Sequence, residues 1–173
     1  MAFSAPRTWV VGELVTAAIM NTFIRDNQIF LAQQEVWSTV THASVTGVII
    51  FYGSYAVARL PAAGDSAYIS LRIPANFGAI VSFKCIVIPR ATQVAADWDL
   101  VSNYAAEGEA YQTHAEADAV TTYNVTNNQV YGIDISGVAT AIAAGDIFGL
   151  RINLNNDAHD LDVVGLSLIY TVA

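Results

Sequence analysis

The amino-acid sequence predicts a mainly β protein, an antiparallel β-sandwich preceded by an extended arm and one α-helix. From residue 45 onward, short segments rich in β-branched and aromatic residues follow one another, and clusters of Gly, Pro, Asn and Asp separate them. No helix-length segment alternates with these strands, which excludes the βαβ pattern of a parallel sheet. Roughly eight to ten strands in about 130 residues indicate two packed sheets, with a jelly roll as the leading topology.

The chain opens with an irregular or extended arm over residues 1–15, in which Trp9 has the character of an anchor. A helix is predicted to follow, because Thr16 is a favourable N-cap and no Gly or Pro interrupts the chain from there to Gln34. At 1.5 Å per residue, such a helix is roughly 28 Å long.

The residues of this predicted helix have the spacing of a short coiled-coil seam. Two sets recur every seven positions and are offset by three. They are Ala17, Ile24 and Leu31, and Met20, Asn27 and Gln34. The candidates for anchoring or oligomerisation are therefore Trp9, Ala17, Met20, Phe23, Ile24, Asn27, Phe30 and Leu31. Three interpretations stay open: packing of the helix on its own domain, self-association through the seam, and docking on a different protein.

Residues 35–44 have lost the helical period, and they are predicted to be a connector or a first strand. Beyond them, ten segments have strand character: 45–52, 55–60, 67–73, 79–88, 98–104, 109–115, 119–125, 129–136, 147–154 and 161–172. A short helix is expected only at 138–143. The chain therefore divides into an anchoring and oligomerisation segment, 1–44, and a jelly-roll-like sandwich, 45–173.

The tetrapeptide Ala-Ala-Gly-Asp occurs twice, at 62–65 and 143–146, and Leu-Arg-Ile follows each copy. The distance from Ala-Ala-Gly-Asp to Leu-Arg-Ile differs by two residues between the copies. Because side chains alternate along a strand, a difference of two leaves the Leu-Arg-Ile side chains on the same faces. We interpret the fragment as one turn-then-strand solution used twice, and not as a duplication.

The composition is apolar and poor in charge. Hydrophobic residues make up 54% of the 173 positions and charged residues 13%, whereas a soluble domain has about a quarter of its residues charged. No apolar segment is long enough to span a bilayer and no signal peptide is recognisable, so the predicted product is made in the cytoplasm and has no membrane partner. A chain with so few charges is expected to bury much of its surface against copies of itself or other proteins.

Charge is also unevenly distributed. Residues 91–150 contain eight carboxylates and no Lys or Arg. Such a segment repels a phosphate backbone, so no nucleic-acid partner is expected.

No motif predicts an enzyme. Gly64-Asp65-Ser66 has the letters of an esterase nucleophile motif, but a strand follows it where that motif needs a helix, which predicts a tight turn. The densest polar cluster comprises Asp157, His159, Asp160 and Asp162. Its spacing fits no metal-binding loop, and a solvated hairpin turn accounts for it. We predict no catalytic residue, no metal and no cofactor, and an inert buried thiol at Cys85.

The region 97–123 interleaves aromatic residues with carboxylates, a combination that can bind sugar rings. The candidate glycan contacts are Trp98, Tyr104 and Tyr111. The competing interpretation is that these aromatic rings belong to the core of the sandwich and that the acidic residues cover its outer loops.

The N-terminal segment carries a specific string: Thr8-Trp9-Val10-x-Gly12-Glu13-x-Val15-Thr16-Ala17-Ala18-x-x-Asn21-x-x-Ile24-Arg25-Asp26-Asn27. It resembles the opening of a family of virion proteins of tailed bacteriophages, which are small tail-fibre, minor structural or head-surface proteins. The resemblance covers about the first 30 residues and brings no catalytic residue with it. It implies a component of a virion, made in the cytoplasm of the host bacterium.

Composition and resemblance together indicate a structural virion protein that contacts capsid or tail proteins. A homotrimeric capsid-decoration or short head-fibre protein, anchored by its N-terminal segment, is the first hypothesis, and the trimer rests on analogy with other virion jelly rolls. The alternative is a receptor-binding or minor tail protein, a fibre or tip component, that recognises carbohydrate on the host surface.

Overall fold

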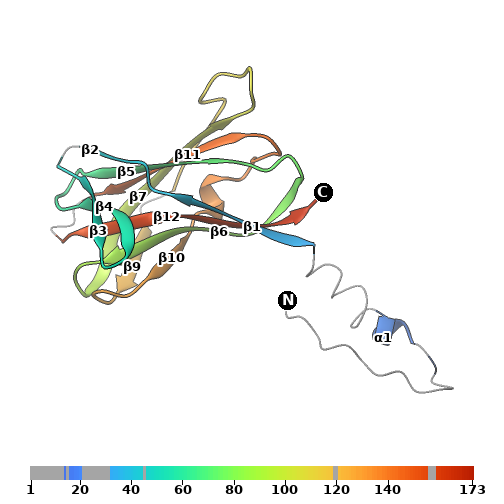
Figure 1. Cartoon of the computed structure of the whole chain (residues 1–173), viewed down its shortest axis with the longest axis horizontal. Helices are drawn as coiled ribbons and strands as arrows, with labels where there is room; N and C mark the ends of the chain where they lie inside the picture. Colours follow the sequence, from blue (N-terminus) through green and yellow to red (C-terminus); the bar gives the residue numbers. More distant parts are fainter. Residues whose placement is uncertain (1–13, 15, 21–31, 45, 119–120, 156–158) are drawn as a thin grey trace.

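The computed structural model describes residues 14, 16–20, 32–44, 46–118, 121–155 and 159–173. Two antiparallel sheets pack face to face (Figure 1). Sheet A contains β1 (Gln33–Thr39), β3 (Val48–Tyr52), β4 (Tyr55–Leu60), β6 (Phe77–Pro89), β10 (Tyr131–Asp134) and β12 (Leu161–Val172). Sheet B contains β2 (His42–Ser44), β5 (Ser66–Arg72), β7 (Gln93–Ala105), β8 (His114–Ala117), β9 (Thr121–Val125) and β11 (Ile147–Leu154). The helical elements within these ranges are α1 (Ala17–Met20) and a 3₁₀ turn, η2 (Ser136–Val138).

The strand order is that of a jelly roll. Sheet A has the order β10-β6-β12-β4-β3, and sheet B has the order β2-β5-β11-β7-β8, with β9 also paired to β7. The chain passes from one sheet to the other as it runs through β4, β5, β6 and β7, and again through β9, β10, β11 and β12. The eight-strand framework is therefore β10-β6-β12-β4 packed on β9-β7-β11-β5, and the predicted fold class is confirmed.

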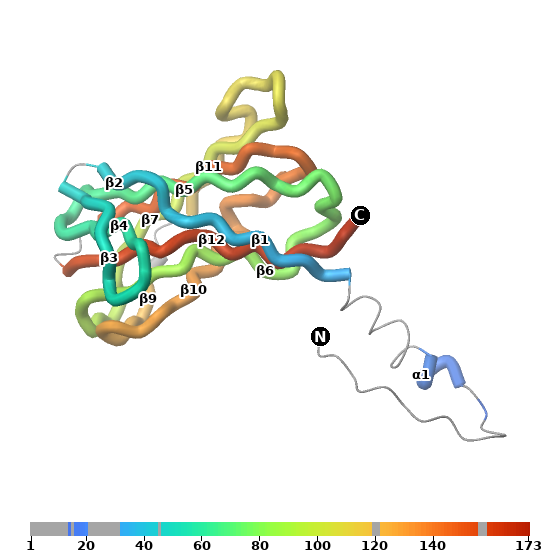
Figure 2. Tube along the Cα trace, in the orientation of Figure 1, coloured from blue at the N-terminus to red at the C-terminus, as the bar shows by residue number. Residues whose placement is uncertain are grey.

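Strand β12 is the centre of sheet A. One edge pairs with β6 along nearly its whole length, and the other edge pairs first with β4 and then with β1. Figure 2 shows β1 lying beside β12 as the chain enters the sandwich. Gly165 sits where β1 comes closest, and a Cβ atom at this position would collide with the carbonyl oxygen of Ser38. A residue without a side chain is therefore required here.

Alternation along the strands fills the space between the sheets with apolar side chains. Phe83 of β6 and Phe148 of β11 meet across this space, with ring centroids 4.9 Å apart. Cys85 is fully buried in the same core, and burial raises the pKa of its thiol to about 12, which confirms the predicted inert cysteine. No helix within the described ranges is long and apolar enough to cross a bilayer.

The predicted helix is corrected at its C-terminal end. Its start is as expected, because the Ile19 amide donates to Thr16 Oγ1 at 3.3 Å. Gln34, however, lies in β1, and the Tyr170 hydroxyl donates to its Oε1 at 2.7 Å. Pairing with the free edge of β12 overrides the local helical preference, because a strand there satisfies a row of backbone groups. The sandwich consequently includes residues 33–44, which the sequence places in the N-terminal segment.

Two other predicted elements are corrected. The segment 109–115 is predicted as a strand, but 106–113 form a loop and β8 starts only at His114. Gly108 has a φ of +93°, and the Glu109 carboxylate accepts the Ala106 amide at 3.0 Å, so the backbone turns where a strand would need it extended. No helix occupies 139–143, because the 3₁₀ turn η2 begins at Ser136 and ends at Val138, where the expected short helix would begin.

The repeated Ala-Ala-Gly-Asp turns occupy opposite ends of the β5–β11 pair. In each turn the aspartate accepts the amide three residues earlier, Asp65 from Ala62 at 3.0 Å and Asp146 from Ala143 at 2.8 Å. The preceding glycine has a φ of +87° in both. The two turns are thus one local solution placed symmetrically about two antiparallel strands.

The close approach at Gly165 generates a prediction. Gly165→Ala is expected to destabilise the fold by about 1–3 kcal/mol or more, because the added methyl forces β1 away from β12. Chemical denaturation measures the change. Gly149→Ala is the matched control in β11, where the nearest atom to an added Cβ is 3.5 Å away. Equal stability of the two variants would contradict the proposed contact.

Candidate functional site

Trp98 and Tyr104 lie in the core, which corrects their assignment as glycan contacts. They are 1% and 0% exposed, and both point inward because they occupy alternate positions of β7. Trp98 stacks on Tyr123 with centroids 5.1 Å apart. The third candidate, Tyr111, is 76% exposed on the 106–113 loop. The sequence indicates that Trp98 and Tyr104 lie on the same face of a strand, but it does not indicate which face of β7 is buried.

The hydroxyl of Tyr104 holds the end of the sandwich together. It donates to Glu116 Oε1 at 2.7 Å and accepts the Ala141 amide at 3.0 Å. Thr140 donates its amide and its hydroxyl to the same carboxylate. Burial acts to raise the pKa of Glu116, but the hydrogen bonds from Thr140 and Tyr104 outweigh it, so the pKa lies below its usual value. This network ties β7 and β8 to the segment after η2.

Asp162, one member of the predicted polar cluster, forms an ion pair. Asp162 is fully buried and accepts two hydrogen bonds from Arg59, at 2.8 and 3.0 Å, while Arg90 Nε lies 3.8 Å away. Asp157 is outside the described residues. Across the described ranges, no group of three His, Cys, Asp or Glu side chains is placed to hold a metal ion. Asp162 therefore joins the start of β12 to β4.

Gly64-Asp65-Ser66 is the tight turn that the sequence predicts. The Asp65 carboxylate is buried and accepts both the amide and the hydroxyl of Thr46 at 2.8 Å. Ser66 is also buried, and its hydroxyl donates to Asn153 Oδ1 at 3.0 Å. A serine held in this way serves the turn and is not presented as a nucleophile.

An open trough lies on the face of sheet B that is turned away from sheet A. It consists of two adjoining hollows of about 440 and 270 Å³ over β5, β11 and β7. The hollows share Ser70, Gly149 and Asn103, which stand side by side in the strand register. The 106–113 loop, at the top of Figure 1, forms one wall.

The trough has one aromatic residue towards each end. Tyr111 and the exposed Ile147 border the larger hollow, and Tyr68 and Arg151 border the smaller one. Glu107 and Glu109 contribute carboxylates to the rim on the side of the loop. Small residues on the floor, aromatic rings at the ends and polar side chains along the walls are the features of a ligand site.

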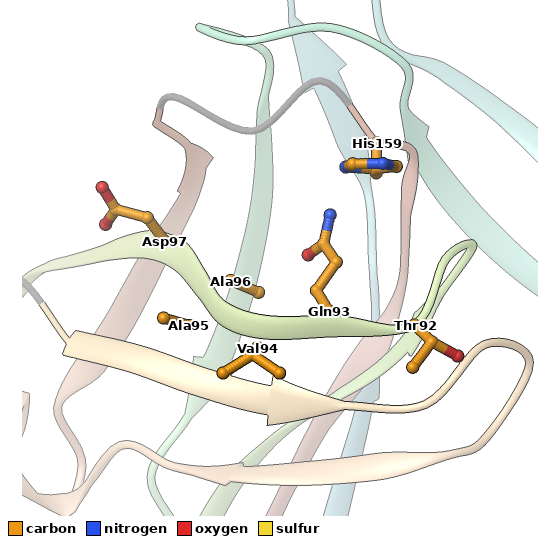
Figure 3. A pocket seen from close by; sticks show the side chains of 7 residues that line it. All are labelled: Thr92, Gln93, Val94, Ala95, Ala96, Asp97 and His159. Atoms are coloured by element: carbon orange, nitrogen blue, oxygen red, sulfur yellow. The ribbon is translucent and has the colours of Figure 1, made fainter.

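Another hollow, of about 450 Å³, lies at the start of β7 (Figure 3). Its lining residues are Thr92, Gln93, Val94, Ala95, Ala96, Asp97 and His159. Figure 3 shows Gln93 extending towards the His159 ring, while Asp97 points away from both. Asp97 is engaged by Asn155, whose amide donates to Oδ2 at 3.2 Å. The trough on sheet B extends over three strands and has two exposed tyrosines, whereas no Phe, Trp or Tyr lines this hollow, so we take the trough as the candidate binding site.

The β3–β4 hairpin exposes several large apolar side chains. Residues 48–58 contain no charged side chain. Phe51 is 78% exposed, and Val48, Ile49 and Tyr55 are about half exposed. β3 also forms one edge of sheet A. Edge strands of monomers are normally protected by charge, Pro or bulges, and this strand has none of these.

Of the eight anchoring candidates, the structure describes two. Ala17 and Met20 are in α1, and none of the residues of that helix is buried. The other six lie outside the described residues: Trp9, Phe23, Ile24, Asn27, Phe30 and Leu31.

The chain matches no protein-family model and no curated protein sequence. Among solved structures, it is similar to a carbohydrate-binding module, CBM36, in complex with calcium and xylotriose, with 14% identity, a TM-score of 0.45, and coverage of 79% of this chain and 98% of that chain. A CBM36-1 domain of a multidomain xylanase from the hindgut metagenome of Trinervitermes trinervoides gives 10% identity, a TM-score of 0.45, and coverage of 79% and 95%. A family 11 carbohydrate-binding module from Clostridium thermocellum, in complex with a β-1,3-1,4-mixed-linked tetrasaccharide, has 10% identity and a TM-score of 0.45. The match covers 82% of this chain and 91% of that chain. Likeness at this level carries no inference about the ligand of this chain.

Asp99 lies on the same face of β7 as the trough and has a raised pKa. Burial is the main cause, and the negative charges of Asp97 and Asp118 add to it, while Arg151 and Asn153 act in the opposite direction. A raised carboxyl pKa means that the folded chain holds this proton more strongly than the unfolded chain. The stability that it contributes is present below the ordinary value of 3.8 and is lost as the pH rises through the raised pKa.

Asp99→Asn is therefore expected to raise the melting temperature at about pH 7 and to leave it nearly unchanged at about pH 3, where the aspartate is protonated. Thermal unfolding at the two pH values measures the difference. Glu107→Gln, at an exposed carboxylate of the neighbouring loop, is the control and is expected to have no such effect. A lower melting temperature for Asp99→Asn at neutral pH would contradict this electrostatic account.

Proposed function

We propose that this chain is a structural subunit of a tailed-phage virion, a homotrimeric capsid-decoration or short head-fibre protein anchored by its N-terminal segment. The observation that carries the proposal is the charge-free segment 48–58 of the β3–β4 hairpin, whose apolar side chains are exposed in the described structure. The resemblance of the first 30 or so residues to phage virion proteins supports the same role.

The energetic reason lies in the hairpin. Complete burial of a side chain such as Phe51 or Ile49 contributes about 1.5–3 kcal/mol. β3 also offers the backbone groups of an edge strand to a partner strand. A single chain obtains neither contribution, whereas a subunit surrounded by neighbours obtains both. The function is accordingly mechanical: burial and strand pairing tie this subunit to the proteins beside it.

The N-terminal segment supplies the second contact. Ala17 and Met20, one residue from each seven-residue set, are not buried in the described structure and are free to enter a helical seam. Three copies of such a seam would place the three sandwiches around one axis. The sandwich then projects from this anchor and meets the surrounding capsid or tail proteins.

A second candidate function is favoured by a different observation. The trough on sheet B suits carbohydrate recognition, which a receptor-binding or minor tail protein performs at the host surface. In this alternative the N-terminal segment has the same anchoring role, and the sandwich is a recognition domain.

The seam predicts self-association in solution, and we propose three chains by analogy with other virion jelly rolls. Sedimentation equilibrium of the full chain is expected to give the mass of a trimer, and Met20→Asp is expected to shift it towards the monomer, because a charge in an apolar seam is costly to bury. Leu14→Asp is the matched control, since this residue is 82% exposed and lies outside the seven-residue pattern. A full chain that sediments as a single subunit would contradict the trimer.

The hairpin predicts a second effect, on incorporation into particles. Phe51→Asp is expected to lower the amount of the chain in particles of the encoding phage several-fold, since it places a charge in the apolar contact. Quantitative mass spectrometry of purified particles measures this amount. Val94→Asp, at an 87% exposed position of sheet B, is the control and is expected to incorporate normally. Absence of the unmodified chain from particles would overturn the virion role.

A further inference from the structure

We infer that the trough on sheet B is a binding site for a neutral oligosaccharide, which lies along the strands between Tyr68 and Tyr111. This inference deepens the second candidate function and rests on it. The structural role of the hairpin and of the N-terminal segment does not depend on it, because those surfaces belong to sheet A and to the start of the chain.

The floor of the trough is flat because its central residue has no side chain. Gly149 of β11 lies between Ser70 of β5 and Asn103 of β7 in the strand register. Packing does not require this glycine: its φ is ordinary, and an added Cβ would meet its nearest neighbour at 3.5 Å. The fold would therefore accept a larger residue at position 149. Because glycine occupies this position, the space above it is open to a ligand.

The trough is elongated along the strands. From the Tyr68–Arg151 row to the Ile147 row there are four residues of β11, or roughly 13 Å. That length spans more than one sugar ring. Tyr68 at one end and Tyr111 at the other are both exposed, and each has a hydroxyl at the tip of its ring. The Tyr68 ring also lies beside His42, with ring centroids 5.8 Å apart. Rings placed in this way can stack on two separate residues of one saccharide chain.

Polar groups on the floor and wall are available for hydroxyl groups. Within the described structure, no hydrogen bond engages the Ser70 hydroxyl, the Asn103 amide or the Tyr111 hydroxyl. Asn103 offers two donors and an acceptor, and Ser70 offers one donor and two lone pairs. These groups can both donate and accept hydrogen bonds. The hydroxyl groups of a sugar also donate and accept hydrogen bonds, so the two sets are complementary.

The charges around the trough are mainly negative, and Arg151 is the basic residue in its lining. Glu107 and Glu109 stand on the rim, and Asp97, Asp99 and Asp118 follow on the neighbouring part of sheet B. These carboxylates repel phosphate groups and acidic sugars. The apolar side chain of Ile147 and the two tyrosine rings favour a ligand with apolar faces. A neutral oligosaccharide has both apolar ring faces and hydroxyl edges.

The experiment uses the full chain and an array of immobilised neutral oligosaccharides, namely glucans, mannans, galactans and xylans, with polyuronate and polylysine as charged probes. Binding to at least one neutral series is expected, and calorimetry with the soluble form of that sugar measures its affinity. Tyr111→Ala is expected to weaken this affinity by roughly ten-fold or more, and Gly149→Leu, which fills the trough, is expected to abolish binding.

Tyr55→Ala is the matched control, because it removes a similarly exposed tyrosine on sheet A and is expected to bind normally. Melting temperatures of all variants show whether they are folded, and Asn103→Ala provides a second test if Gly149→Leu does not fold. Binding of polylysine alone, binding of no neutral sugar, or binding that is unchanged in folded Tyr111→Ala and Asn103→Ala variants would each overturn the inference. A trimer that binds no sugar would leave the structural role standing, so the two failures are distinguishable.

Discussion

The pairing of β12 with strands on both of its edges is the constraint on which the rest of the sandwich depends. It joins the chain's last strand to β6 on one side and to β4 and β1 on the other. Two local features make this possible: Gly165 lets the β1 backbone come close, and the buried Asp162 is neutralised by Arg59. A buried aspartate without a partner would be strongly unfavourable, so the start of β12 can lie only where an arginine meets it.

The exposed surfaces of the two sheets have different chemistry. Sheet A has the β3–β4 hairpin at one edge, where residues 48–58 carry no charge and several apolar side chains are exposed. Sheet B carries a hollow lined by tyrosine, asparagine and serine, with carboxylates nearby. The proposed assembly surface and the proposed recognition surface do not overlap, so the two proposals are compatible in one subunit.

Most aromatic residues of the 97–123 region serve the fold and not a site. Trp98 and Tyr104 fill the core, and the Tyr104 hydroxyl completes a network with Glu116. Tyr111 differs because Gly108 and Glu109 turn the chain into a loop before the next strand begins. The same residue type thus becomes core or surface according to where the backbone bends.

The sequence by itself determined the alternation of most strands, the turns between them, the two Asp-capped turns and the poverty of charge, because each depends on neighbours along the chain. Tertiary structure alone decided three other matters. It drew Gln33 and Gln34 out of the predicted helix, since the open edge of β12 offered a row of hydrogen-bond partners. It also determined which face of β7 is buried. Alternation along a strand shows which residues share a face, but only the packing of a second sheet decides which of the two faces is covered. It also brought Ser70, Asn103 and Gly149, far apart in the sequence, into one row of a trough, because strand order across a sheet is a long-range property.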